Sequence, residues 1–210
     1  MLLYGYYRSS AAYRVRIALN LKGLQAEHRF RHLRRGEQRS VDYLPTNPQG
    51  LVPALVLEDG TALTQSLAIV EYLDETHPTP RLMPADPVQR ARVRAFAQAI
   101  ACEIHAVQNL KILSRLRALG HDDATVNAWA HDTIAEGLAA CEALIAQESG
   151  PFCFGARPTL ADLALVPQLY NARRFNVVTT AMPRLLAAEA ASLAMPAFSE
   201  AAPERQPDAE

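Results

Sequence analysis

The chain has 210 residues, half of them hydrophobic and a fifth charged, which is the balance of a globular protein with a sizeable buried core. Its 21 basic and 22 acidic residues nearly cancel, which argues against a general binder of nucleic acids or anionic membranes, since such proteins carry a basic excess. No stretch reaches the roughly 18 apolar residues that cross a bilayer, and the start, MLLYGYYRSS, lacks the features of a signal peptide.

Residues 1–79 alternate short apolar runs with helical patterns. The predicted elements, in chain order, are a buried strand at 2–7, a helix at 10–22, a second strand at 26–33, a short helix, a hairpin at 52–64 and a helix at 65–78. Gly23 stands where a helix commonly stops, Asp59-Gly60 suits a tight hairpin, and Pro78 ends the last helix. This order predicts an α/β domain with a mixed sheet.

Residues 80–86 are predicted to link two domains, because the surrounding PTPRLMPADP holds four prolines in ten residues. Beyond the linker the pattern is helical only, so 87–210 is predicted to be an all-α domain. One apolar stripe at helical spacing consists of Val93, Phe96, Ala97, Ile100, Ile104 and Val107. Further helical runs cover about 123–147, 159–172 and 183–194.

The cysteines and two of the histidines could form disulfides or bind metal, but their spacing does not indicate either kind of site. The three cysteines, Cys102, Cys141 and Cys153, are scattered without C-x-x-C spacing, which is typical of reduced thiols in the cytoplasm. His28 and His32 lie in a predicted strand without further ligands, so no metal site is expected.

Two local motifs are more informative about the fold. Thr159 and Asp162 form the pattern of a capping box at a helix start. Val52-Pro53, just before a predicted strand, suits a cis peptide bond, with an ordinary strand-entry proline as the alternative.

The segment YRSSAAYRVRIALN places two serines, Ser9 and Ser10, between the first strand and the first helix, where one of them is expected to cap the helix. Residues 9–19 read SSAAYRVRIAL, and they resemble the opening signature of zeta-class glutathione transferases, the maleylacetoacetate and maleylpyruvate isomerases. Further matching pieces, in order, are LNLKG, NPQGLVPAL, TQSLAIVEYLDE, PTPRLMPADP, VQNLKIL, PTLADLALVPQLYNARRFNV and RQPD. The resemblance implies a thioredoxin-like domain at 1–79, an all-helical domain at 87–210, glutathione as cofactor and a homodimer.

The resemblance also implies the site residues. Ser9 would contact the glutathione sulfur at a helix N-terminus, where N–H groups and the helix dipole favour a thiolate. Ser10 would follow as the helix-start residue, and Arg8 would stabilise negative charge on the substrate. The implied cofactor contacts are Ser9, Gln38, Val52, Pro53, Gln65, Ser66, Gln108 and Asn109. Because the substrates of this family carry two carboxylates, cations are expected at the pocket, and the candidates are Arg8, Lys111 and Arg174, with an exposed, ion-paired side chain as the alternative.

The implied activity is a cis-trans isomerisation of a maleyl keto acid, a small dicarboxylate, to its fumaryl isomer. The glutathione thiolate would add to the double bond, allow rotation and leave again. Family members often carry a cysteine where this chain has Ala11, so reductive dehalogenation through a protein thiol is not expected. The alternatives are a general glutathione transferase or peroxidase, and a non-catalytic protein that keeps the fold.

Overall fold

The computed structural model describes all residues, 1–210, and divides into two compact units, Met1–Leu82 with Ala194–Glu210, and Met83–Leu193. The first unit is a small mixed α/β domain and the second is entirely helical, so the predicted fold class is confirmed. No helix combines the length and the apolar character needed to cross a lipid bilayer.

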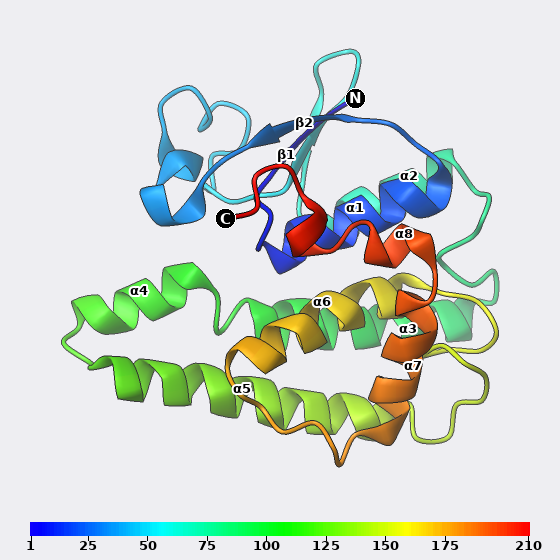
Figure 1. The fold of residues 1–210 in the computed structure, drawn as a ribbon. Coiled ribbons are helices and arrows are strands. Elements are labelled where there is room, and N and C mark those ends of the chain that lie inside the picture. Colours follow the sequence, from blue (N-terminus) through cyan, green and yellow to red (C-terminus); the bar gives the residue numbers. More distant parts are fainter. The chain divides into compact units, whose positions relative to one another are not determined.

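The first unit is built on a four-stranded sheet with the order β2-β1-β3-β4. Its strands are β1 (Leu2–Gly5), β2 (Glu27–Phe30), β3 (Ala54–Val56) and β4 (Ala62–Thr64). Strand β2 runs parallel to β1, whereas β3 and β4 form an antiparallel hairpin beside it. Helices α1 (Ser10–Lys22) and α2 (Ser66–Thr76) pack against each other below the sheet (Figure 1).

Local sequence signals set the ends of these elements. Ser9 caps α1, and Gly23 ends it in the left-handed region with φ 65°, a conformation that glycine adopts without a steric penalty. Gly60 has φ 88° in the turn between β3 and β4, as the Asp59-Gly60 pair predicts. The predicted helix starting at residue 10 and the predicted hairpin are therefore confirmed.

The second unit contains α3 (Pro87–Gln98), a π-helical segment (Ala99–His105), α4 (Leu110–Ala118), α5 (Asp123–Leu144), α6 (Leu160–Arg174) and α7 (Pro183–Leu193). Five members of the predicted stripe, from Val93 to Ile104, are buried. The stripe does not continue as one α-helix, however, because the chain widens into the π-helical segment at Ala99. A new helix begins where Asn109 accepts a hydrogen bond from the N–H of Ile112 at 3.2 Å.

Residues after α7 depart from the predicted boundary of the helical domain. The segment Ala194–Glu210, with the short helix α8 (Pro196–Ser199), belongs to the first unit. It lies along α1, where Tyr13 donates to the carbonyl of Phe198 at 3.1 Å and Asn20 to that of Ala197 at 3.0 Å (Figure 1). Side chains of α1 donate hydrogen bonds to carbonyl groups of this segment, and sequence periodicity does not reveal such long-range pairs.

The cysteines are free thiols, and none is part of a disulfide. Cys141 and Cys153 are buried, and burial raises the pKa of the Cys141 thiol to about 12. Cys102 is exposed in the π-helical segment. A high thiol pKa suppresses the reactive thiolate, so the two buried cysteines are packing residues.

Gly137 of α5 marks a close approach between α5 and the π-helical segment. A Cβ atom at this position would lie 2.3 Å from Cγ1 and 2.5 Å from Cδ1 of Ile104, a side chain that is 1% exposed. Glycine costs about 1 kcal/mol of helix stability relative to alanine, and here it is retained because no larger residue fits.

We expect Gly137→Ala to lower the free energy of unfolding by about 1–2 kcal/mol, because overpacking of a tight core outweighs the gain in helix propensity. Chemical denaturation measures the change. In a double-mutant cycle with Ile104→Ala, the Gly137→Ala cost should vanish, because the clashing atoms are gone. Additive effects of the two substitutions would contradict this account.

Candidate functional site

One edge of the sheet gathers the ends of several segments of the first unit. Gly5 pairs with Phe30, so the chain leaves β1 and β2 at the same edge. Tyr4 pairs with Ala54, and Ala54 pairs with Thr64, so the chain enters β3 and leaves β4 there as well. This pairing brings the turn before α1, the segment 52–53 and the start of α2 together at one edge.

Ser9 is the N-cap of α1 at this edge. Its Oγ accepts a hydrogen bond from the N–H of Ala12 at 3.1 Å, and its side chain is buried. A hydroxyl that accepts one bond keeps its own proton for donation to a second group. Ser9 is therefore the helix cap, and its hydroxyl proton remains available for donation at the positive end of the helix, while Ser10 is the first helical residue.

The start of α2 has an unusual backbone conformation. Gln65 has φ 67° and ψ 114°, although it is not glycine, and its Nε2 donates to Oε1 of Gln49 at 2.9 Å. Such a conformation costs about 1–3 kcal/mol and persists only where the surrounding structure imposes it, most often at functional sites. Ser66 follows as the first residue of the helix and is buried. The first N–H groups of α2 point out of the helix end, as donors for an anion.

The peptide bond between Val52 and Pro53 is cis, which confirms the prediction. Neither the N–H nor the C=O of Val52 forms a backbone hydrogen bond, so both remain for a ligand. The preceding carbonyl, that of Leu51, accepts from Tyr43 Oη at 2.6 Å and from Asn47 Nδ2 at 2.8 Å. Two buried side chains therefore hold the segment that presents the Val52 backbone.

Two further predicted site residues, Gln38 and Arg8, lie in the first unit. Gln38 lies in a short 3-10 turn, Glu37–Arg39, and its buried Oε1 has no hydrogen-bond partner. Arg8 is half-exposed directly before Ser9, with its guanidinium 5.9 Å from the centroid of the Tyr7 ring.

The remaining predicted residues lie in the second unit. Gln108 is buried and its Nε2 has no partner, and Asn109 caps α4. Lys111 is exposed on α4, a helix separate from the one that carries the start of the apolar stripe. Arg174 is exposed at the end of α6 and donates to Oδ1 of Asn171 at 3.3 Å.

Lys111 and Arg174 are close in sequence to residues of one apolar cluster in the second unit. Phe175, next to Arg174, packs against a cluster of Leu113, Val126 and Ala130, and Leu113 is two residues after Lys111. The two cations therefore lie at the same end of the helical unit.

Sequence reasoning missed one residue that connects the site. Arg14 is 1% exposed and donates from Nη1 to Oγ of Ser66 at 3.2 Å, which ties α1 to the start of α2. A single sequence gives no signal for this role, because buried arginines are rare and Arg14 lies in a helix with charged neighbours. The Asn109 cap, in contrast, could have been predicted from asparagine's preference for helix starts.

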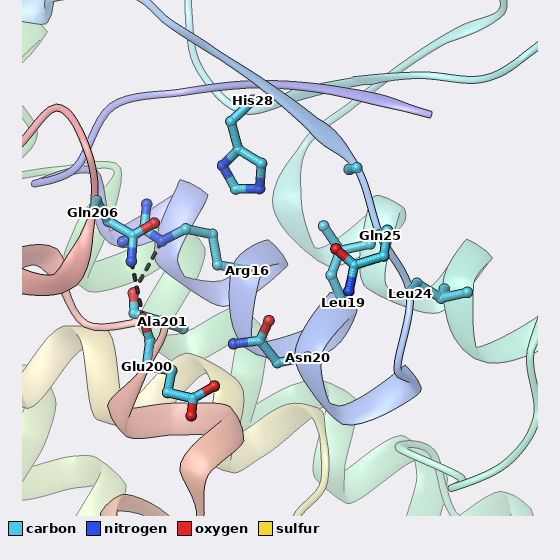
Figure 2. Close-up of a pocket in the computed structure, with 10 residues that line it drawn as sticks. Arg16, Leu19, Asn20, Leu24, Gln25, His28, Glu200, Ala201 and Gln206 are labelled. Atoms are coloured by element: carbon cyan, nitrogen blue, oxygen red, sulfur yellow. Dashed lines mark hydrogen bonds between the residues drawn. The ribbon is translucent and has the colours of Figure 1, made fainter.

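A cavity of about 100 Å³ lies elsewhere in the first unit, among α1, the start of β2 and the segment after α8 (Figure 2). Its lining includes Arg16, Asn20, His28 and Gln206, and none of the predicted site residues. Burial, followed by the charge of Arg16, lowers the pKa of the His28 imidazole, which favours its neutral form.

Comparison with known proteins agrees with this geometry. Residues 3–81 match the family model of the glutathione S-transferase N-terminal domain, and residues 106–187 match that of the C-terminal domain. The maleylacetoacetate isomerase of Pseudomonas aeruginosa is 49% identical over 210 residues, which cover 99% of this chain and 98% of that protein.

Two solved structures are similar over the full length of both chains. A bacterial maleylpyruvate isomerase of the zeta class of glutathione transferases has a TM-score of 0.96 at 46% identity. The maleylacetoacetate isomerase of Methylobacterium extorquens AM1, with bound malonate and GSH, has a TM-score of 0.96 at 39% identity. The chain therefore belongs to the glutathione S-transferase family, within the zeta class of maleylacetoacetate and maleylpyruvate isomerases.

Proposed function

We propose that the protein is a glutathione-dependent isomerase that converts a maleyl keto acid, maleylacetoacetate or maleylpyruvate, to its fumaryl isomer. The observation that carries the proposal is the meeting, at one sheet edge, of the Ser9 hydroxyl, the cis Val52-Pro53 segment and the start of α2 at Gln65. The full-length likeness to isomerases of both substrates supports it.

The residues at this edge fit glutathione, a peptide-like anion. The unpaired N–H and C=O of Val52 suit the cysteinyl part, and the start of α2 at Gln65 and Ser66 suits the γ-glutamyl carboxylate. Gln38 and Gln108 each carry a buried polar atom without a partner, as expected of side chains that a ligand completes. We assign the glycyl end to Gln38.

Glutathione supplies the thiolate that adds reversibly to the cis double bond, so that the bond can rotate. Ser9 stabilises that thiolate by donating a hydrogen bond to the sulfur, and the positive end of α1, where Ser10 begins the helix, adds to the effect. Both interactions favour the charged form of the thiol and lower its pKa, so more of the nucleophile is present at neutral pH.

The substrate carries two carboxylates, and the proposed contacts are cationic. Arg8, adjacent to Ser9, would neutralise charge that develops on the keto oxygen, which stabilises the transition state more than the ground state. Lys111 and Arg174, at one end of the helical unit, would bind the carboxylates. The relative with bound malonate and GSH supports this assignment, because malonate is a dicarboxylate.

The proposal is tested by mixing the purified protein with maleylpyruvate and, separately, maleylacetoacetate, with and without glutathione, and following the ultraviolet spectrum. We expect conversion to the fumaryl product only with glutathione. The ratio of the two rates identifies the preferred substrate, since selectivity for such close analogues rests on about 1–3 kcal/mol of pocket contacts. Conjugation of a chlorinated aromatic acceptor without any isomerisation would instead establish a general transferase.

We further propose that the protein acts in the cytoplasm as a homodimer, as the resemblance to the zeta class implies. The free thiols are consistent with a reducing compartment. Sedimentation equilibrium measures the oligomeric state, and a monomer at micromolar concentration would contradict the dimer.

The strained residue at the start of α2 gives a prediction that separates stability from binding. We expect Gln65→Gly to raise the free energy of unfolding by about 1 kcal/mol, because glycine adopts φ 67° freely, and to weaken glutathione binding about tenfold by removing the amide. Denaturation and calorimetric titration measure the two effects. Gln65→Ala is the control, since it loses the amide and keeps the strain. Equal stabilities of the two variants would contradict the assignment of strain.

A further inference from the structure

The turn between β1 and α1, Tyr6–Ser9, is held by a buried arginine outside the proposed site. The Ser9 N–H donates to the Tyr6 carbonyl at 3.0 Å, which closes the turn. Arg16 of α1 donates from Nη1 to the same Tyr6 carbonyl at 3.4 Å and from Nη2 to the Tyr7 carbonyl at 3.1 Å. Arg16 is only 5% exposed, so these bonds form away from water.

The segment after α8 holds the same turn from a second side. Asp208 Oδ2 accepts a hydrogen bond from the Tyr7 N–H at 2.9 Å. The segment is fixed to α1 by the bond from Arg16 Nε to the Ala201 carbonyl at 3.0 Å (Figure 2). Both backbone polar groups of Tyr7 are therefore bonded to residues beyond the turn: the carbonyl to Arg16 and the N–H to Asp208.

Burying the Arg16 guanidinium and the Asp208 carboxylate costs desolvation free energy. Burial lowers the pKa of the Arg16 guanidinium to about 10, against the opposing charge of Asp208. The second carboxylate oxygen of Asp208, Oδ1, is buried without a hydrogen-bond partner. Apolar residues of similar volume would pack a domain at lower cost in desolvation, but they could not fix the orientation of a peptide group.

We infer that Arg16 and Asp208 are positioning residues, which hold the Tyr6–Ser9 turn so that Ser9 and Arg8 face the thiolate and the substrate. The inference rests on the proposed function, and it assigns a role to the RQPD segment, residues 205–208, that the site itself does not use. Neither residue is among the proposed contacts of glutathione or substrate. They act through the turn, where a displacement of about 1 Å is enough to lower the rate up to a hundredfold.

The test compares Asp208→Ala with Asp208→Asn, whose amide oxygen still accepts from Tyr7. Thiolate absorbance near 240 nm gives the pKa of bound glutathione, and initial rates with maleylpyruvate give kcat and the KM for glutathione. For Asp208→Ala we expect kcat to fall at least tenfold, the thiol pKa to rise and the KM to change less than threefold. For Asp208→Asn we expect all three values to stay near those of the wild type.

The matched control is Asn20→Ala, which removes the 3.0 Å bond from α1 to the Ala197 carbonyl and leaves the turn untouched. It should lower the melting temperature without moving kcat or the thiol pKa. If Asp208→Ala does not fold, Asp208→Ser, whose hydroxyl is too short to reach Tyr7, replaces it with the same expected result. Wild-type kcat and thiol pKa in the folded Ala or Ser variant would overturn the inference, as would equal losses in Asp208→Asn and Asp208→Ala.

These outcomes separate the inference from the proposed function. A wild-type protein that does not isomerise either maleyl substrate, but lowers the pKa of bound glutathione in a manner that depends on Asp208, would refute the proposed substrate and support the positioning role. A wild-type protein that isomerises, with an Asp208→Ala variant indistinguishable from it, would refute the positioning role alone.

Discussion

We expect Ser9→Ala to lower kcat/KM for isomerisation by about a hundredfold to a thousandfold, because it removes the side-chain donor proposed to stabilise the thiolate. The pKa of bound glutathione should rise at the same time. The substitution also removes the bond to the Ala12 N–H, which costs about 1 kcal/mol of stability. Steady-state kinetics, thiolate absorbance and thermal unfolding measure the three effects.

Two further variants separate chemistry from capping. Ser9→Gly loses the hydroxyl but caps a helix almost as well as serine, so it should lose the activity and only a few tenths of a kcal/mol of stability. Ser9→Thr keeps a hydroxyl and should retain a substantial part of the activity. If Ser9→Gly stays within threefold of the wild-type rate, the Ser9 hydroxyl is a cap alone and the thiolate has another donor.

The largest expected loss of stability is that of Asp162→Ala, about 3 kcal/mol or more, or roughly 10 °C in melting temperature. Asp162 is 0% exposed. Its Oδ1 accepts from the Cys153 N–H at 2.8 Å, and its Oδ2 accepts from the Thr159 N–H at 2.8 Å and from Thr159 Oγ1 at 3.1 Å. Removing the carboxylate leaves three buried donors unpaired at the start of α6, and each such group costs about 1–3 kcal/mol.

Asp122→Ala is the matched control for this prediction. Asp122 also caps a helix, α5, and accepts from the Thr125 N–H at 2.8 Å, but it is exposed, so water replaces the lost bond. The control should therefore cost about 1 kcal/mol. Urea denaturation of both variants at pH 7 measures the difference. Equal losses in the two variants would show that burial of the Asp162 network adds nothing.

Much of the fold could be predicted because local chemistry sets the helix ends. Serine before residue 10 and glycine at 23 bracket α1, and the Thr159 and Asp162 pattern marks the start of α6. The cis bond at Val52-Pro53 could be predicted from its place before a strand together with the family resemblance. Such signals lie within a few residues of the feature they determine, so they are readable in one sequence.

The features that could not be predicted are the widening of a helix and hydrogen bonds between residues far apart in the sequence. The apolar stripe from Val93 to Ile104 has the same spacing whether or not the helix widens at Ala99, so the sequence pattern does not indicate the π-helical segment. The buried roles of Arg14 and Arg16 depend on partners far along the chain, namely Ser66 and the Ala201 carbonyl. Charged residues in a helix are read as exposed unless these partners are known.

The hydrogen bond between Tyr7 and Asp208 joins residues 201 positions apart, and this has a consequence for synthesis on the ribosome. Domains commonly fold while the chain is still being made, N-terminal part first. Here the first unit includes residues 194–210, which emerge after the whole helical unit and, at translation rates of about 5–20 residues per second, roughly ten to forty seconds after Tyr7. The nascent chain therefore carries its sheet and first helices before the turn at Ser9 gains its bond to Asp208, so the proposed positioning of Ser9 follows only after residue 208 has emerged.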